Sequence, residues 1–134
     1  MTINVDGRVV ANGRPIAGGS MYDNGVQTLD FTGLPTLWNN QTVSIYWVST
    51  TNASYGSNTE LTKNGTAYTY TIQEEMSAYE SVKAFINITD GTNNWNTQEF
   101  IIKFNKLFGI GEDTSVSSYY PAWVSVPLAN GVGF

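Results

Sequence analysis

The sequence contains neither cysteine nor histidine among its 134 residues. Without cysteine, the chain has no disulfide, no zinc thiolate site and no thiol nucleophile. Without histidine, it lacks the commonest general base and metal ligand, and every Ser-His or Cys-His pairing. We therefore expect a protein that is not an enzyme and that holds no cofactor or metal.

Charge is also scarce. Charged residues make up 13% of the chain, about half of the ~25% that is typical of soluble domains. The net charge is −5, and the basic residues are scattered along the sequence, at Arg8, Arg14, Lys63, Lys83, Lys103 and Lys106. Because an acidic chain without a basic patch is repelled by phosphates, nucleic acid is not an expected partner.

Long apolar runs are missing as well. No segment approaches the roughly 20 consecutive apolar residues of a membrane-spanning helix. The first residues, 1–6, lack the basic and apolar regions of a signal peptide. We expect no membrane span and synthesis in the cytoplasm of the producing cell.

The strongest positive pattern lies at residues 81–104. Apolar residues alternate with mostly polar ones in both halves of this stretch, at Val82, Ala84, Ile86, Ile88, Phe100, Ile102 and Phe104. Phe85 and Ile101 are apolar exceptions on the polar parity. Between the halves, Asp90 and Gly91 begin a run of turn-forming residues. The stretch predicts a β-hairpin with one buried face.

Shorter alternating stretches predict further strands, at residues 26–31, 42–48, 59–61 and 66–72. Asn64-Gly65 favours a tight hairpin turn, residues 49–58 are expected to form a polar loop, and residues 73–79 a short helical turn. Trp47 is expected in the core. Six or seven short strands without long helices predict an all-β fold, an immunoglobulin-like antiparallel β-sandwich.

Three regions are expected along the chain. Residues 1–25 are rich in glycine and predict an extended N-terminal arm, residues 26–105 form the sandwich, and residues 106–134 form an aromatic and apolar C-terminal tail. Prolines make a central strand unfavourable in this tail. We expect it to dock onto a partner through Tyr119, Tyr120, Trp123, Val124 and Leu128.

Two clusters of carboxylate residues are candidate chemical sites. Glu74 and Glu75, with Glu80, could serve a glycoside hydrolase, but neighbouring glutamates in a short turn are typical of a solvated corner. Asp90 could bind calcium together with nearby asparagines, although the spacing lacks the order of the known calcium loop. For both groups a structural role is favoured.

Aromatic residues are the remaining binding candidates. Trp38, Tyr55 and Trp95 fall in expected loops, where they either cap the sandwich or contact a glycan or protein surface. This leaves open a carbohydrate-binding module that recognises host cell-surface glycans, such as cell-wall saccharides, through loop aromatics.

Several segments resemble the N-terminal domain of phage upper baseplate proteins, in which a D-L-T-G strand leads into a K-Y-x-A-Y-x-x-I-x-D-G hairpin ending near S-T-x-x-F. The segments are Leu29-Asp30-Phe31-Thr32-Gly33, Thr42-Val43-Ser44-Ile45, Ser81-Val82-Lys83-Ala84-Phe85-Ile86-Asn87-Ile88, Asp90-Gly91, Trp95-Asn96-Thr97-Gln98 and Thr97-Gln98-Glu99-Phe100. The resemblance covers roughly residues 22–104.

The resemblance implies an immunoglobulin-like sandwich that builds a virion appendage and carries or anchors host-binding proteins. We therefore expect a non-enzymatic virion structural protein, assembled in the host cytoplasm, whose partners are other virion proteins and copies of itself. A baseplate or tail component and a capsid decoration protein both fit these residues. The carbohydrate-binding module and a small hydrolase are the alternatives.

Overall fold

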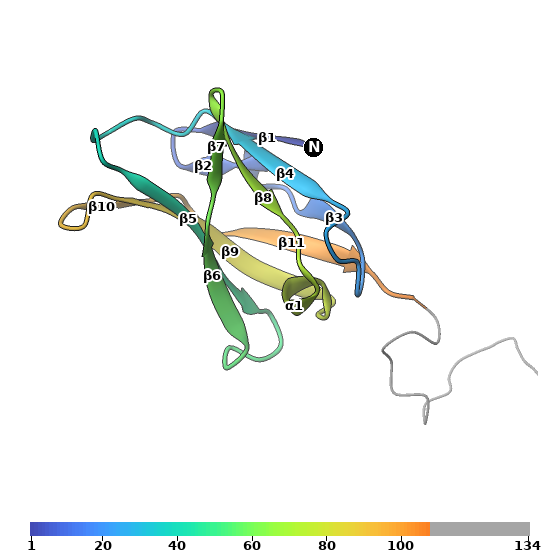
Figure 1. Cartoon of the computed structure of the whole chain (residues 1–134). Coiled ribbons are helices and arrows are strands. Elements are labelled where there is room, and N and C mark those ends of the chain that lie inside the picture. Colours follow the sequence, from blue (N-terminus) through green and yellow to red (C-terminus); the bar gives the residue numbers. More distant parts are fainter. Residues whose placement is uncertain (108–134) are drawn as a thin grey trace, which may run out of the picture.

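The computed structural model describes residues 1–107, which form two β-sheets (Figure 1). The first sheet has the order β2-β1-β4-β8-β7, with the strands β1 (Thr2–Asp6), β2 (Val9–Val10), β4 (Thr28–Thr32), β7 (Thr62–Asn64) and β8 (Ala67–Thr71). The second has the order β3-β11-β9-β5-β6, with β3 (Ile16–Ser20), β5 (Thr42–Ser49), β6 (Gly56–Glu60), β9 (Ser81–Thr89) and β11 (Phe100–Asn105). A short strand, β10 (Asn94–Asn96), also pairs with β9.

The predicted all-β sandwich is confirmed. The orders β1-β4-β8-β7 and β11-β9-β5-β6 correspond to immunoglobulin strands A, B, E, D and G, F, C, C′. Two pairs depart from the expected antiparallel arrangement, because β1 runs parallel to β4 and β3 runs parallel to β11. The helical elements are one turn of 3-10 helix, η1 (Ala11–Gly13), and one turn of α-helix, α1 (Glu74–Ser77). Among residues 1–107, no helix has the length and apolarity to span a membrane.

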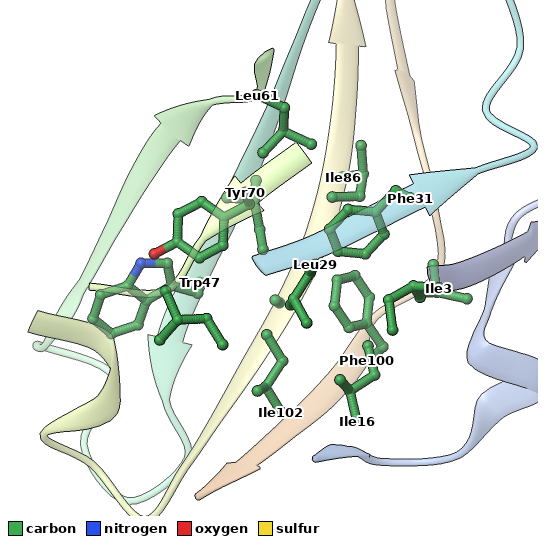
Figure 2. Close-up of a cluster of buried hydrophobic side chains, with 14 of the residues drawn as sticks. Ile3, Ile16, Leu29, Phe31, Trp47, Leu61, Tyr70, Ile86, Phe100 and Ile102 are labelled. Atoms are coloured by element: carbon green, nitrogen blue, oxygen red, sulfur yellow. The ribbon is translucent and has the colours of Figure 1, made fainter. Parts of the chain in front are cut away.

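The predicted hairpin at residues 81–104 supplies much of the core. Its alternating apolar residues on β9 and β11 are all buried. Figure 2 shows Ile86, Phe100 and Ile102 pointing toward Leu29 and Phe31 of β4, so the two sheets share one apolar interior. The alternating pattern predicts burial correctly because successive strand residues point to opposite faces, and only one face of each sheet meets the other sheet.

The second half of the hairpin is divided into β10 and β11, which the sequence did not predict. Thr97 lies between them and is buried. Its backbone N–H donates to the Ile86 carbonyl at 3.0 Å, and its hydroxyl oxygen accepts from the Ile86 N–H at 2.9 Å. A side chain thus replaces one backbone partner, which keeps β9 hydrogen-bonded across the break.

The expectation of an N-terminal arm at residues 1–25 is wrong. Ile3 on β1 and Ile16 on β3 are buried in the core, and each strand is paired with a distant one. Gly18, which suggested a linker, lies so close to β11 that an added Cβ would be 2.6 Å from the Phe104 ring. The glycine therefore permits close packing in the second sheet and does not mark a flexible segment.

The middle of the chain is partly as predicted. The turn at Asn64-Gly65 joins β7 to β8, α1 occupies the expected helical turn, and Trp47 is buried. Part of the expected polar loop at 49–58 instead forms β6, which pairs with β5. Leu61 separates β6 from β7, is buried, and donates its N–H to the Val43 carbonyl at 2.8 Å. The chain crosses from one sheet to the other at this residue.

The C-terminal tail lies almost wholly outside the described residues. This includes all of the predicted docking residues, namely Tyr119, Tyr120, Trp123, Val124 and Leu128. The last strand within the described residues, β11, ends at Asn105.

Candidate functional site

The outer face of the second sheet, turned away from the core, contains a hollow with a volume of about 560 Å³. We call it the outer hollow. It is lined by β5, β6, β9, the loop between β5 and β6, and Glu99. The pairing register aligns two rows of outward residues across three strands, Asn58–Tyr46–Phe85 and Gly56–Val48–Lys83. Residues distant in the sequence therefore meet on one surface.

An aromatic pair stands at the centre of this surface. Tyr46 on β5 and Phe85 on β9 are directly opposite each other, and their rings stack with centroids 5.3 Å apart and planes within 1° of parallel. Tyr46 is 38% exposed, whereas Phe85 is half-buried. Cross-strand stacking holds both rings in place on the two strands that form the middle of the sheet.

A glycine lies in the lining of the outer hollow. Gly56 lies beside Val48, and an added Cβ would be 2.8 Å from Val48 Cγ1 and would collide with the Trp47 carbonyl oxygen. Any larger residue would push β6 away from β5. Gly56 lines the outer hollow without filling any of it with a side chain.

The polar lining of the outer hollow is electrically balanced. Lys83 Nζ lies 3.8 Å from Glu99 Oε1, and both side chains are substantially exposed. Such an exposed pair adds little stability, but the two charges offset each other. The side chains of Asn58 and Ser54 make no hydrogen bond to another residue within 1–107. These groups are available to a polar ligand.

An amide cluster extends the polar surface along the same sheet. The Asn87 side-chain amide donates to Asn96 Oδ1 at 2.8 Å and to Asn94 Oδ1 at 3.4 Å. Asn87 is two residues beyond Phe85 on β9 and therefore shares its face. On the side of Asn87, the aromatic pair is thus bordered by uncharged amides.

Trp95, one of the predicted contact residues, is part of the sandwich packing. It lies on β10 and not in a loop, and is half-buried. The Arg8 guanidinium covers its ring at 4.8 Å and donates to the Asn96 carbonyl at 2.8 Å. This cation–π contact ties the turn between β1 and β2 to the edge of the second sheet.

Trp38 and Tyr55 do lie in loops, as predicted. Trp38 packs partly against the core, and its backbone N–H donates to Gln41 Oε1 at 3.2 Å. Tyr55 is 53% exposed and stacks on Tyr79 with centroids 5.8 Å apart.

The three predicted aromatics do not form one surface. Tyr55 accepts a hydrogen bond from Ser49 at the end of β5, whereas Trp95 is opposite Ile88, which pairs with Val43 near the start of β5. The two rings therefore flank opposite ends of the strand. The outer hollow, which the sequence analysis did not identify, lies between these ends.

The glutamates that the sequence offered as a hydrolase site lie in and near a helical turn. Glu74 and Glu75 occupy the first turn of α1, where the Glu74 N–H donates to Asn24 Oδ1 at 3.0 Å. The Glu80 carbonyl accepts from the Phe104 N–H at 2.9 Å. Within residues 1–107, no three acidic side chains are grouped as metal ligands.

Asp90 acts as a turn residue. Its Oδ1 accepts from the Thr92 and Asn93 N–H groups at 2.9 and 2.7 Å, and its Oδ2 accepts from the Asn93 amide at 3.2 Å. These hydrogen bonds, led by the Asn93 backbone N–H, lower the pKa of the Asp90 carboxyl. Its oxygens are thus engaged in closing the hairpin turn.

Comparison with known proteins does not identify a family. No family model matches the chain, and no curated protein matches it either. The resemblance to phage upper baseplate proteins therefore stays a prediction.

Proposed function

We propose that this chain is a non-enzymatic structural component of a phage virion, in a baseplate, tail or capsid decoration, which docks onto neighbouring subunits. The resemblance across residues 22–104 supports the virion assignment. The sandwich itself supports a binding role, because it presents a shaped aromatic surface on a rigid sheet.

One observation carries the docking mechanism. The apolar faces of the two sheets already bury each other within residues 3–104. Tyr119, Tyr120 and Trp123 of the tail follow these residues in the sequence and are aromatic. We propose that they bind a groove on a neighbouring virion protein or a second copy of the chain. The edge strands β6 and β7 could extend this contact by strand addition.

The test is incorporation into particles. The full chain, a deletion of residues 117–134, and a full-length variant with Tyr119, Tyr120 and Trp123 changed to serine would be supplied to phage lacking the protein. Quantitative mass spectrometry of purified particles would then measure each chain, after circular dichroism has confirmed the fold of each variant.

We expect the full chain in particles and both altered chains to be depleted at least tenfold, roughly the effect of losing one anchoring side chain. The serine variant is the matched control for chain length. Absence of the full chain from particles would refute the virion role, while normal incorporation of both variants would refute docking through the tail.

A further inference from the structure

We propose that the outer hollow binds a neutral saccharide, with Tyr46 and Phe85 as the apolar contact and Asn58 as a hydrogen-bonding group. This rests on the proposed function, since it names a surface through which a virion component would contact a host glycan. The proposed saccharide site lies on the face of the sheet and not at the loop aromatics that the sequence suggested.

The size of the outer hollow suits a short oligosaccharide. Its volume of about 560 Å³ falls within the range of roughly 300–1,000 Å³ that small-ligand sites occupy. The row of Gly56 and Val48 lies beside the aromatic row on the same face of the sheet. A chain of sugar rings can lie along these two rows without entering the core.

The chemistry of the lining matches the two-sided character of a sugar ring. A pyranose presents C–H groups on its faces and hydroxyls around its rim. Tyr46, Phe85 and Val48 provide apolar surface, while Asn58 and Ser54 offer donors and acceptors that have no partner within residues 1–107. Each part of the ligand therefore has a complementary group.

The charge of the outer hollow favours an uncharged ligand. Lys83 is the only cation in the lining, and Glu99 lies 3.8 Å from it. A phosphate or carboxylate would have to displace this partner, against a chain with a net charge of −5. A neutral saccharide needs no such exchange.

The surrounding surface favours a small polar ligand over a protein. A stable protein interface buries about 800 Å² on each partner around an apolar centre. The large apolar side chains that are well exposed within residues 1–107 are Met1, Val26, Leu37, Tyr46 and Tyr55. Only Tyr46 of these lines the outer hollow, and its apolar neighbours there, Phe85 and Val48, are half-buried.

The site is also preorganised. Tyr46 and Phe85 stack on each other in the free protein, and their strands pair continuously from Thr42 to Ser49. Binding therefore requires little ordering of the aromatic contact, which lowers its entropic cost.

The test uses the purified full chain and a set of neutral probes, namely cellotriose, maltotriose and chitotriose, followed by an array of neutral and charged glycans. Isothermal titration calorimetry would measure affinity for the wild type, Tyr46→Ala, Tyr46→Phe and Asn58→Ala. Tyr55→Ala is the matched control, because it removes an exposed tyrosine that does not line the outer hollow.

We expect binding of a neutral saccharide, weakened about tenfold or more by Tyr46→Ala and severalfold by Asn58→Ala. Tyr46→Phe and Tyr55→Ala should stay within about threefold of wild type. Asn58 is exposed on an edge strand, so Asn58→Ala tests the site even if Tyr46→Ala does not fold.

Three results would overturn the proposal: no binding of any neutral glycan at millimolar concentration, binding of charged glycans alone, or affinity unchanged by both Tyr46→Ala and Asn58→Ala. The measurement needs no particles, so its failure leaves the virion role intact. Conversely, a chain absent from particles could still bind the saccharide.

Discussion

The two faces of β5 and β9 are built from the same strands but obey different constraints. On the inner face, Ile45 and Ile86 are fully buried between the sheets. On the outer face, the neighbouring residues Tyr46 and Phe85 stack at the surface. Packing explains the inner residues, because burial of apolar area drives folding. Folding alone does not require two aromatic rings on the outer face, so these rings are the better indicators of function.

Adjacent residues on β9 provide the sharpest test of this contrast. Ile86→Ala should lower the free energy of unfolding by about 2–5 kcal/mol, since it leaves a cavity in the core. Phe85→Ala removes a larger side chain but should cost only about 1 kcal/mol, the usual scale for cross-strand pairs and strand propensity. Urea denaturation measures both values. Equal losses would mean that the outer aromatic row is a second core.

The break between β10 and β11, where Thr97 is buried, allows a test with a smaller expected effect. Thr97→Val preserves the shape of the side chain but leaves the Ile86 N–H without its acceptor. We expect a loss of about 1–3 kcal/mol in the free energy of unfolding, the cost of an unsatisfied buried donor. Thr97→Ser keeps the hydroxyl and should recover most of the loss. An unchanged urea midpoint for Thr97→Val would show that water replaces the hydroxyl.

The same contrast explains which parts of the fold were predictable. On β9, every second residue from Val82 to Ile88 is apolar because one face meets the opposite sheet. The local pattern was therefore enough to predict this strand of the hairpin. The N-terminal strands were missed for the opposite reason. Gly18 resembles a linker residue in the sequence, and its role depends on the Phe104 ring, which lies more than eighty residues away in the chain. Parallel pairing of β1 with β4 likewise has no local turn signal.

The outer hollow was harder to predict from the sequence than the fold. Phe85 stood out as an apolar exception on the polar parity, and Tyr46 shared the polar parity of β5, so both signals were present. Their contact depends on the register between residues 46 and 85, which alternation within each strand does not determine. The role of Gly56 depends in turn on its approach to the Trp47 carbonyl.

The smallest expected effect concerns Tyr70, a buried tyrosine, and develops only at alkaline pH. Burial, aided by the negative charge of Glu75 and opposed by a hydrogen bond from the Gln73 backbone, raises the pKa of Tyr70 from 10.0 to about 12. The unfolded chain therefore loses this proton first. The stability that Tyr70 contributes is fully present below pH 10 and is lost as the pH rises toward 12.

Between about pH 9 and about pH 11, the urea midpoint should fall more for the wild type than for Tyr70→Phe, since phenylalanine does not ionise. Equal decreases would show that the Tyr70 hydroxyl is hydrated in the folded protein, and hence that water reaches the inner face near α1.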